Sequence, residues 1–213
     1  MTRLIAVRLW LFWPLSALVL TACAWQDAER SRLSPVYDSK TGLLTKLSYD
    51  ANGNGRIDTW THMHGTRLLR VEADTDEDSR IDRWEYYGPD GELAKVGLSR
   101  FDDGVVDTWA VRGPQGELSR IETSSRRDGR VDRTEFFAKR ALARVEEDTD
   151  RDGKTDKWEI YENSALAILA LDTQQRGVPD RRLIYRADGS LDRVETDSDG
   201  DGMFEPVNEG VSR

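Results

Sequence analysis

The sequence predicts an all-β protein, built as a repetitive antiparallel β-hairpin meander that is solenoid-like and forms one twisted or rolled sheet. Three observations predict this fold class. An acidic loop and an aromatic run recur every 24 or 25 residues, a Pro, Asp or Gly turn and a second extended run follow, and neither run has a helical period. Such a fixed period is typical of stacked units that bury one another's faces. The seven loops begin at Asp50, Asp74, Ser99, Ser124, Asp148, Asp172 and Asp197.

One repeat shows how the predicted elements follow each other. The run 81–87 is rich in aromatic and β-branched residues and predicts a strand. The cluster 88–91 (Gly-Pro-Asp-Gly) predicts a hairpin turn, and 93–96 predicts the returning strand. Two strands, a turn and a loop fill the whole period, so the unit is a β-hairpin. The segment 35–47 resembles half a repeat without its acidic loop, as expected of an N-terminal cap.

Tryptophan recurs at the eleventh position, counted from the first residue of each loop. The thirteenth position lies on the same strand face, whereas the fourteenth, also aromatic in several repeats, lies on the other. We interpret the tryptophans as a continuous core stripe; an exposed row that stacks on sugars or docks a partner is the alternative. The tryptophans at this position are Trp60, Trp84, Trp109 and Trp158.

The first 22 residues are typical of a targeting segment, because Arg3 and Arg8 precede an apolar run that ends in small residues. The run is short for a membrane span and contains Pro14. Residues 20–23 (Leu-Thr-Ala-Cys) resemble the lipobox of bacterial lipoproteins, which implies removal of 1–22 and lipidation of Cys23. An ordinary signal peptide is the alternative. Residues 23–32 then form a tether, and 33–213 form a single repeat domain.

Composition limits the partners and the way the chain is stabilised. With Cys23 as the only cysteine, neither an intramolecular disulfide nor a thiolate metal site can form. The formal net charge of −9 argues against nucleic acid as a partner. A chain with 38% hydrophobic and 33% charged residues builds a thin core, which makes additional cross-links valuable.

The acidic loops resemble the calcium loops of EF-hands, thrombospondin type 3 repeats and integrin-type propellers. Alternate side chains of such a tight loop converge on one point, and Ca²⁺ takes six to eight oxygen ligands. The resemblance covers the loops only, and it implies Ca²⁺ as the cofactor. The fullest copy, loop 5, supplies Asp148, Asp150, Asp152 and Asp156, with Gly153 at the turn and Glu159 at position twelve.

Three further loops match the pattern to different degrees. Loop 2 has a serine in place of the turn glycine, loop 7 has the most specific string, and loop 1 carries less charge. Loop 2 supplies Asp74, Asp76, Asp78, Asp82 and Glu85. Loop 7 supplies Asp197, Asp199, Asp201 and Glu205, and loop 1 supplies Asp50, Asn52, Asn54 and Asp58. A solvated acidic turn is the alternative for any one loop, but repetition at a fixed spacing favours calcium.

Loops 3, 4 and 6 depart from the pattern. Loop 3 has Phe101 at the third position, and two loops place an arginine where a carboxylate belongs: Arg126 in loop 4 and Arg176 in loop 6. Arginine can form forked contacts with carboxylates. We therefore expect Arg126 and Arg176 to supply the positive charge that calcium supplies elsewhere.

No catalytic constellation is present in the sequence. His62 and His64 are the only histidines and are interpreted as a surface pair, and no glycine-rich phosphate loop precedes a helix. We expect no enzymatic activity, but a lipid-anchored, calcium-binding spacer or interaction scaffold at the bacterial cell envelope. Ala24, by resemblance to lipoproteins of two-membrane bacteria, implies the outer membrane. The alternative is a glycan- or protein-binding module, similar in architecture to MORN-like hairpin repeats, that uses the aromatic row.

Overall fold

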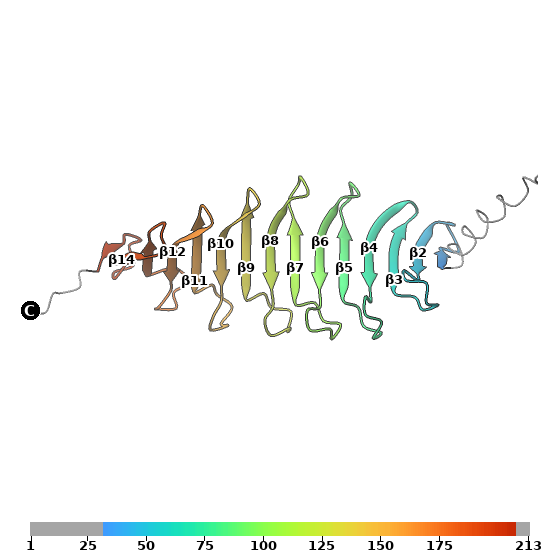
Figure 1. Ribbon diagram of the computed structural model, residues 1–213, viewed down its shortest axis with the longest axis horizontal. Coiled ribbons are helices and arrows are strands. Elements are labelled where there is room, and N and C mark those ends of the chain that lie inside the picture. Colours follow the sequence, from blue (N-terminus) through green and yellow to red (C-terminus); the bar gives the residue numbers. More distant parts are fainter. Residues whose placement is uncertain (1–31, 208–213) are drawn as a thin grey trace, which may run out of the picture.

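The computed structural model describes residues 32–207, and all regular secondary structure in that range is β (Figure 1). The predicted signal peptide, Cys23 and all of the predicted tether except Arg32 lie outside the described residues. The strands are β1 (Leu33–Tyr37), β2 (Leu44–Tyr49), β3 (Thr59–His64), β4 (Arg67–Ala73), β5 (Arg83–Tyr87), β6 (Leu93–Leu98), β7 (Thr108–Arg112), β8 (Leu118–Thr123), β9 (Arg133–Ala138), β10 (Ala141–Glu147), β11 (Lys157–Glu162), β12 (Ala165–Leu171), β13 (Arg181–Tyr185), β14 (Leu191–Thr196) and β15 (Glu205–Pro206).

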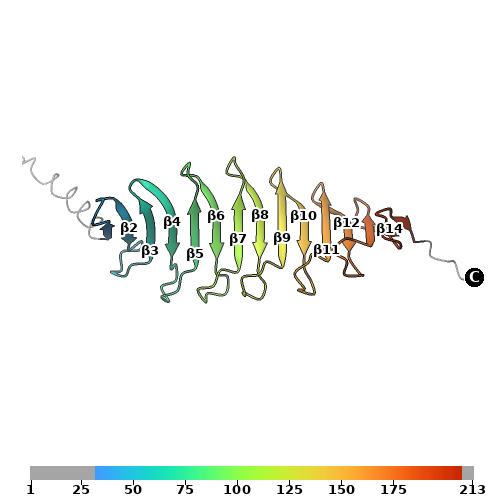
Figure 2. The same cartoon turned by 180° about the vertical axis from the view of Figure 1, so that it is seen from behind.

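These strands form one antiparallel sheet in which every strand pairs with its neighbours in the sequence, from β1 to β15. The hairpin turns lie along one long edge and the acidic loops along the other (Figures 1 and 2). The predicted all-β hairpin meander is therefore confirmed. Of the two forms left open, a rolled or an open sheet, the structure has the open one. No helix long and apolar enough to cross a membrane is found within residues 32–207.

The hairpin turns use the backbone conformations that tight connections require. In the β5–β6 turn, Gly91 has a φ of 82° and its N–H donates to the carbonyl of Gly88 at 3.1 Å. The β9–β10 turn instead places Lys139 and Arg140 at φ values of 51° and 66°. Two consecutive positive φ values match the twist of a two-residue hairpin, even without glycine. Local turn geometry therefore sets the register of each hairpin.

One face of the sheet carries the predicted aromatic row. Register places Trp84 opposite Gly97, and Gly97 opposite Trp109. A Cβ atom at Gly97 would lie 2.7 Å from the Trp109 ring, so glycine is required for this close packing. Lys95 lies above the same ring at 4.2 Å and above the Tyr86 ring at 4.8 Å. The aromatic row is thus packed into the sheet face, with cations covering ring faces.

The other face carries an aliphatic row between carboxylates and aromatic rings. Val145 pairs with Glu135 on one side and Glu159 on the other, and it is 1% exposed. No second sheet covers this face within residues 32–207. Within residues 32–207 the buried apolar residues are only Val96, Val145 and Ala170. The thin core expected from composition is present.

Replacing Val145 by alanine removes buried methyl groups from this row and should lower the free energy of unfolding by about 2 kcal/mol. Val36→Ala is the matched control, since Val36 lies on edge strand β1 and is 51% exposed. Urea denaturation of both variants measures the difference. Equal losses in the two variants would show that the aliphatic row does not stabilise the sheet.

Candidate metal centres along one edge of the sheet

The buried polar residues of this protein are concentrated in the acidic loops, at the first and ninth positions. These residues are Asp50, Asp58, Asp74, Ser99, Asp107, Ser124, Asp172, Asp180 and Asp197. From loop 2 onward, the backbone N–H of the first residue donates to the carbonyl of the preceding loop's ninth residue, as from Asp74 to Asp58 at 2.8 Å and from Ser99 to Asp82 at 2.8 Å. Adjacent loops are therefore joined by main-chain hydrogen bonds that continue the sheet.

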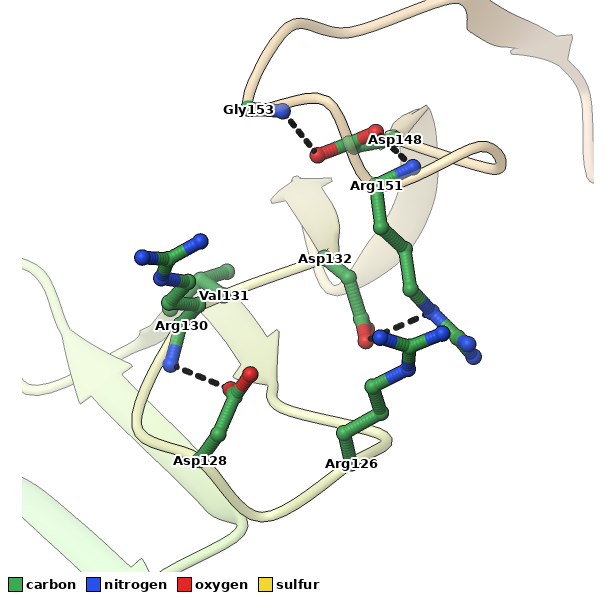
Figure 3. A pocket seen from close by; sticks show the side chains of 8 residues that line it. All are labelled: Arg126, Asp128, Arg130, Val131, Asp132, Asp148, Arg151 and Gly153. Atoms are coloured by element: carbon green, nitrogen blue, oxygen red, sulfur yellow. Dashed lines mark hydrogen bonds and ion pairs between the residues drawn. The ribbon is translucent and has the colours of Figure 1, made fainter.

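Side-chain carboxylates of the first and ninth positions organise each loop. In loop 5, Asp148 Oδ1 accepts the N–H of Arg151 at 2.6 Å and Oδ2 accepts that of Gly153 at 2.9 Å (Figure 3). Gly153 has a φ of 94°, which explains the glycine of the pattern. Asp156 accepts the N–H of Thr149 at 2.9 Å. The carboxylates that were predicted as ligands thus also hold the loop's shape.

Three of the four predicted loops gather carboxylates closely enough to share a cation. In each set, one oxygen from every residue lies within 4.8 Å of the others. The sets are Asp74, Asp76 and Asp78 in loop 2, Asp148, Asp150 and Asp156 in loop 5, and Asp197, Asp199 and Asp201 in loop 7. Asp152 of loop 5 and Glu205 of loop 7 belong to none of these sets; Asp152 accepts the N–H of Lys154 at 2.8 Å, and Glu205 lies in edge strand β15.

Loop 2 contains carboxylate oxygens without a partner among the described residues. Asp74 is 4% exposed; its Oδ2 accepts the N–H of Ser79 at 3.0 Å, whereas its Oδ1 is buried and has no hydrogen bond. Asp82 Oδ1 is also buried and unpaired. A buried carboxylate oxygen without a donor is destabilising, and a bound cation would satisfy it. The residues of loop 2 therefore fit a hard divalent cation.

Loop 1 holds its residues differently. Burial acts to raise the pKa of Asp50, but the N–H groups of Gly55, Gly53 and Asn54 lower it below its ordinary value. Asp58 accepts the N–H of Ala51 at 2.9 Å. The amide groups of Asn52 and Asn54 both donate to Glu77, which belongs to loop 2. Loop 1 therefore gains its third carboxylate from the next repeat.

The contact from Glu77 is one case of a general feature that sequence reasoning missed. In loops 2 to 6 the fourth residue has a left-handed backbone, and its side chain reaches back to the preceding loop. The φ values are 64° for Glu77, 57° for Asp102, 60° for Arg127, 67° for Arg151 and 57° for Gln175. The signal in the sequence was a long or charged side chain at position four. The calcium-loop pattern places ligands at positions one, three, five and nine, so it assigns no role to position four.

Asp102 makes the most unusual of these contacts. Its carboxylate lies with those of Asp76 and Asp82, with one oxygen of each within 4.8 Å of the others. Close contact with the carboxylates of Asp82 and Asp76, together with desolvation and the nearby charge of Asp78, raises the pKa of Asp102 to about 6. Carboxylates placed this closely repel unless a proton or a cation lies between them.

In loops 3 and 4 the fourth-position contact brings an arginine instead. Arg127 pairs with Asp103 of loop 3, and Arg151 lies 4.0 Å from Asp132 of loop 4. Figure 3 shows the second pair, with Arg126 beside it but not joined to either residue. Among the described residues, neither Arg126 nor Arg176 forms an ion pair. In loops 3 and 4 the paired arginine comes from the following repeat. In loop 6, burial acts to raise the pKa of Asp172, but backbone N–H groups, including that of Arg176, and the charge of Arg176 lower it overall.

The predicted position-twelve glutamates lie on the sheet and in none of the acidic clusters of residues 32–207. Glu85 accepts hydrogen bonds from Arg83 at 2.8 Å and from the Tyr87 hydroxyl at 2.6 Å. Burial acts to raise the pKa of Glu85, but Tyr87 and Arg83 lower it overall. Glu159 is held in the same way, with the Tyr161 hydroxyl at 2.7 Å. A strand following the loop, unlike a helix, turns this side chain away.

The histidine pair does not gather further ligands. His62 Nε2 lies 2.9 Å from Glu72 and 3.3 Å from Arg70 on the sheet face. His64 ends strand β3 near the opposite edge from the acidic loops and is exposed. Neither histidine belongs to a cluster of three metal-binding side chains within residues 32–207.

Tyr87→Phe should destabilise the protein at pH 7 by about 1 kcal/mol, because it removes a hydrogen bond to a charged glutamate. Glu85 has a lowered pKa in the folded state, so its contribution is present above the ordinary value of 4.5 and is lost as the pH falls through the folded-state value. The difference from the parent chain should therefore shrink in acid. Urea melts from pH 7 to pH 3 measure it, with exposed Tyr37→Phe as the control. A pH-independent difference would contradict this account.

Comparison with protein-family models and with curated proteins finds no match for this chain. The ligand of the loops is therefore inferred from the loop residues themselves. The relevant features are the carboxylate sets of loops 2, 5 and 7, the unpaired oxygens of Asp74 and Asp82, and the side chains that reach a loop from the next repeat.

Proposed function

We propose that this chain is a calcium-binding β-hairpin repeat protein that acts as a spacer or interaction scaffold at the bacterial cell envelope, anchored by a lipid on Cys23. The observation that carries the proposal is the row of carboxylate clusters on one edge of the sheet, together with the buried, unpaired Oδ1 atoms of Asp74 and Asp82. Such oxygens call for a cation in a chain that has no disulfide to stabilise it.

The chemistry of the donors favours calcium over other metals. The clusters offer only oxygen, which suits hard cations and does not suit zinc or copper. Two ligands 2.3 to 2.6 Å from a common Ca²⁺ are at most about 5 Å apart, which is compatible with the 4.8 Å spacing of each set. Irregular loops with differing donor numbers suit Ca²⁺, because Mg²⁺ demands near-ideal octahedral geometry.

The shape of the sheet supports a spacer. Fourteen strand-to-strand steps of about 4.8 Å give a strip of roughly 65 Å. The tether from Cys23 leads into β1, at one end of this strip, so the other end lies far from an anchored lipid. Cations along the loop edge would stiffen the strip by removing repulsion between carboxylates.

The aromatic row gives less support to a glycan-binding module. Stacking on a sugar needs a free ring face, and Lys95 covers Trp109 while Lys46 lies above Trp60 at 5.9 Å. An envelope protein docked on the exposed sheet is compatible with a scaffold and remains the second candidate partner.

Calcium should raise the melting temperature of the purified chain. Three sites, each with free ion tenfold above its dissociation constant, would add about 4 kcal/mol, which corresponds to roughly 8–16 °C for a chain of this size. Melting curves in Ca²⁺ and in EGTA measure the shift, and equilibrium dialysis measures the bound ion. Mg²⁺ at the same concentration is the control and should have a smaller effect. Identical melts in Ca²⁺ and EGTA would refute the proposal.

Cys23→Ala should move the protein from the membrane fraction to the soluble fraction, because each buried acyl CH₂ contributes about 0.8 kcal/mol to membrane binding. Fractionation of cells and labelling with a radioactive fatty acid measure the change. Cys23 is the only thiol, so the parent chain should carry the label at one residue. Unchanged membrane association of the variant would exclude the lipid anchor.

A further inference from the structure

We propose that the cation site of loop 2 spans two repeats, with Asp102 of loop 3 as a ligand beside Asp74, Asp76, Asp78 and Asp82. The proposal rests on the proposed cation-binding function and deepens it, because it makes the bound cation a cross-link between successive hairpins. It also assigns a ligand that lies outside the loop's own sequence pattern.

The backbone of loop 3 holds Asp102 in place for this role. Asp102 has a φ of 57°, and its N–H donates to the Ser99 carbonyl at 3.3 Å. Its own carbonyl accepts a hydrogen bond from Arg80 of loop 2 at 3.1 Å. Arg80 thus holds the main chain of the next loop against its own, and the Asp102 carboxylate lies over loop 2.

Two carboxylate sets meet at this point. Asp76 belongs both to the set with Asp74 and Asp78 and to the set with Asp82 and Asp102. Because Asp76 is common to both sets, a cation bound at Asp76 lies next to carboxylates from two loops.

Two independent features of this cluster point to a ligand. Asp74 is 4% exposed, and its Oδ1 has no hydrogen-bond partner among the described residues. Asp82 Oδ1 is equally unpaired, although the other oxygen of Asp82 accepts a 2.6 Å hydrogen bond from the Thr75 hydroxyl. Asp74 belongs to the set with Asp76 and Asp78, and Asp82 belongs to the set with Asp76 and Asp102, so both unpaired oxygens are on residues of the shared cluster.

Protein cations do not neutralise this cluster. Arg80 is the only basic side chain that pairs with it among residues 32–207, at 3.7 Å from Asp78. Five carboxylates with one guanidinium leave a strong negative charge, which favours a divalent cation. In loops 3 and 4, by contrast, Arg127 and Arg151 occupy the place that Asp102 occupies here.

The residue at position four therefore selects the way in which the preceding loop is neutralised. Asp102 supplies a fifth carboxylate to loop 2, Arg127 supplies a guanidinium to loop 3, and Gln175 supplies a neutral amide 2.8 Å from Asp150 of loop 5. Because Asp102 comes from the next hairpin, cation binding at loop 2 also orders loop 3.

The test compares Asp102→Asn with Asp90→Asn in the full chain. Asparagine keeps the left-handed backbone at 102 and removes only the charge. Asp90 lies in a hairpin turn at the opposite edge, where its Oδ1 accepts the Glu92 N–H at 3.0 Å, a contact that asparagine preserves. Calcium titrations followed by hydrogen exchange of peptides from loops 2 and 3 report on this site separately from the others.

In the parent chain and in Asp90→Asn, calcium should slow exchange in both loops. In Asp102→Asn, the calcium concentration needed to protect loop 2 should rise at least about tenfold, and protection of loop 3 should be lost. Asp102→Arg places an arginine beside loop 2, as Arg127 and Arg151 lie beside loops 3 and 4. This variant should abolish the protection of loops 2 and 3 by calcium and raise the melting temperature in EGTA.

Two other outcomes overturn the inference in distinguishable ways. If Asp102→Asn binds like the parent while Asp76→Asn loses the site, loop 2 binds its cation alone and only the shared site is wrong. If the parent chain shows no calcium-dependent protection in any loop, the proposed function fails together with this inference.

Discussion

The constraint that shapes this protein is that its sheet has only one layer. Within residues 32–207, each strand pairs only with its neighbours in the sequence and no second layer covers either face, so burial of apolar side chains is limited to a few residues such as Val145. Hydrophobic burial is the main stabilising term in most folds. Here the buried residues are mostly loop carboxylates and hydroxyls at one edge. The stability of the strip therefore depends on the hydrogen bonds and opposite charges that pair with these groups.

The loops satisfy their carboxylates in three ways. Backbone N–H groups bind the first and ninth residues in every loop that keeps an aspartate there, as Asp148 and Asp156 illustrate. Arginines from the next repeat neutralise loops 3 and 4. Loop 2 has neither enough donors nor enough arginine, which leaves Asp74 and Asp82 with unpaired oxygens. The sheet therefore combines loops whose carboxylates are paired with protein groups and a loop that keeps buried, unpaired carboxylate oxygens.

The open sheet is an extended strip. Its main-chain hydrogen bonds run along its length, because the strands cross the strip and pair from one end to the other. Side-chain contacts between successive loops also connect the repeats along the strip. Examples are the contact of Glu77 with loop 1 and that of Gln175 with loop 5. Stability in such a chain is approximately a sum of repeat terms and neighbour terms. Cations shared between repeats would strengthen the neighbour terms, which resist bending of the strip.

The sequence by itself determined the hairpin unit, the order of the strands and the grouping of the loops on one edge, because a 24- or 25-residue period with turn residues at fixed places specifies local hydrogen bonds. Only the tertiary structure decided that the sheet stays open, that Glu85 and Glu159 lie on its face, and that Asp102 and Arg151 reach the preceding loop. The physical reason is that a ligand pattern describes the residues of a single loop, whereas stacking brings together residues about 25 positions apart in the sequence. How closely the side chains of neighbouring loops approach depends on strand spacing and backbone twist.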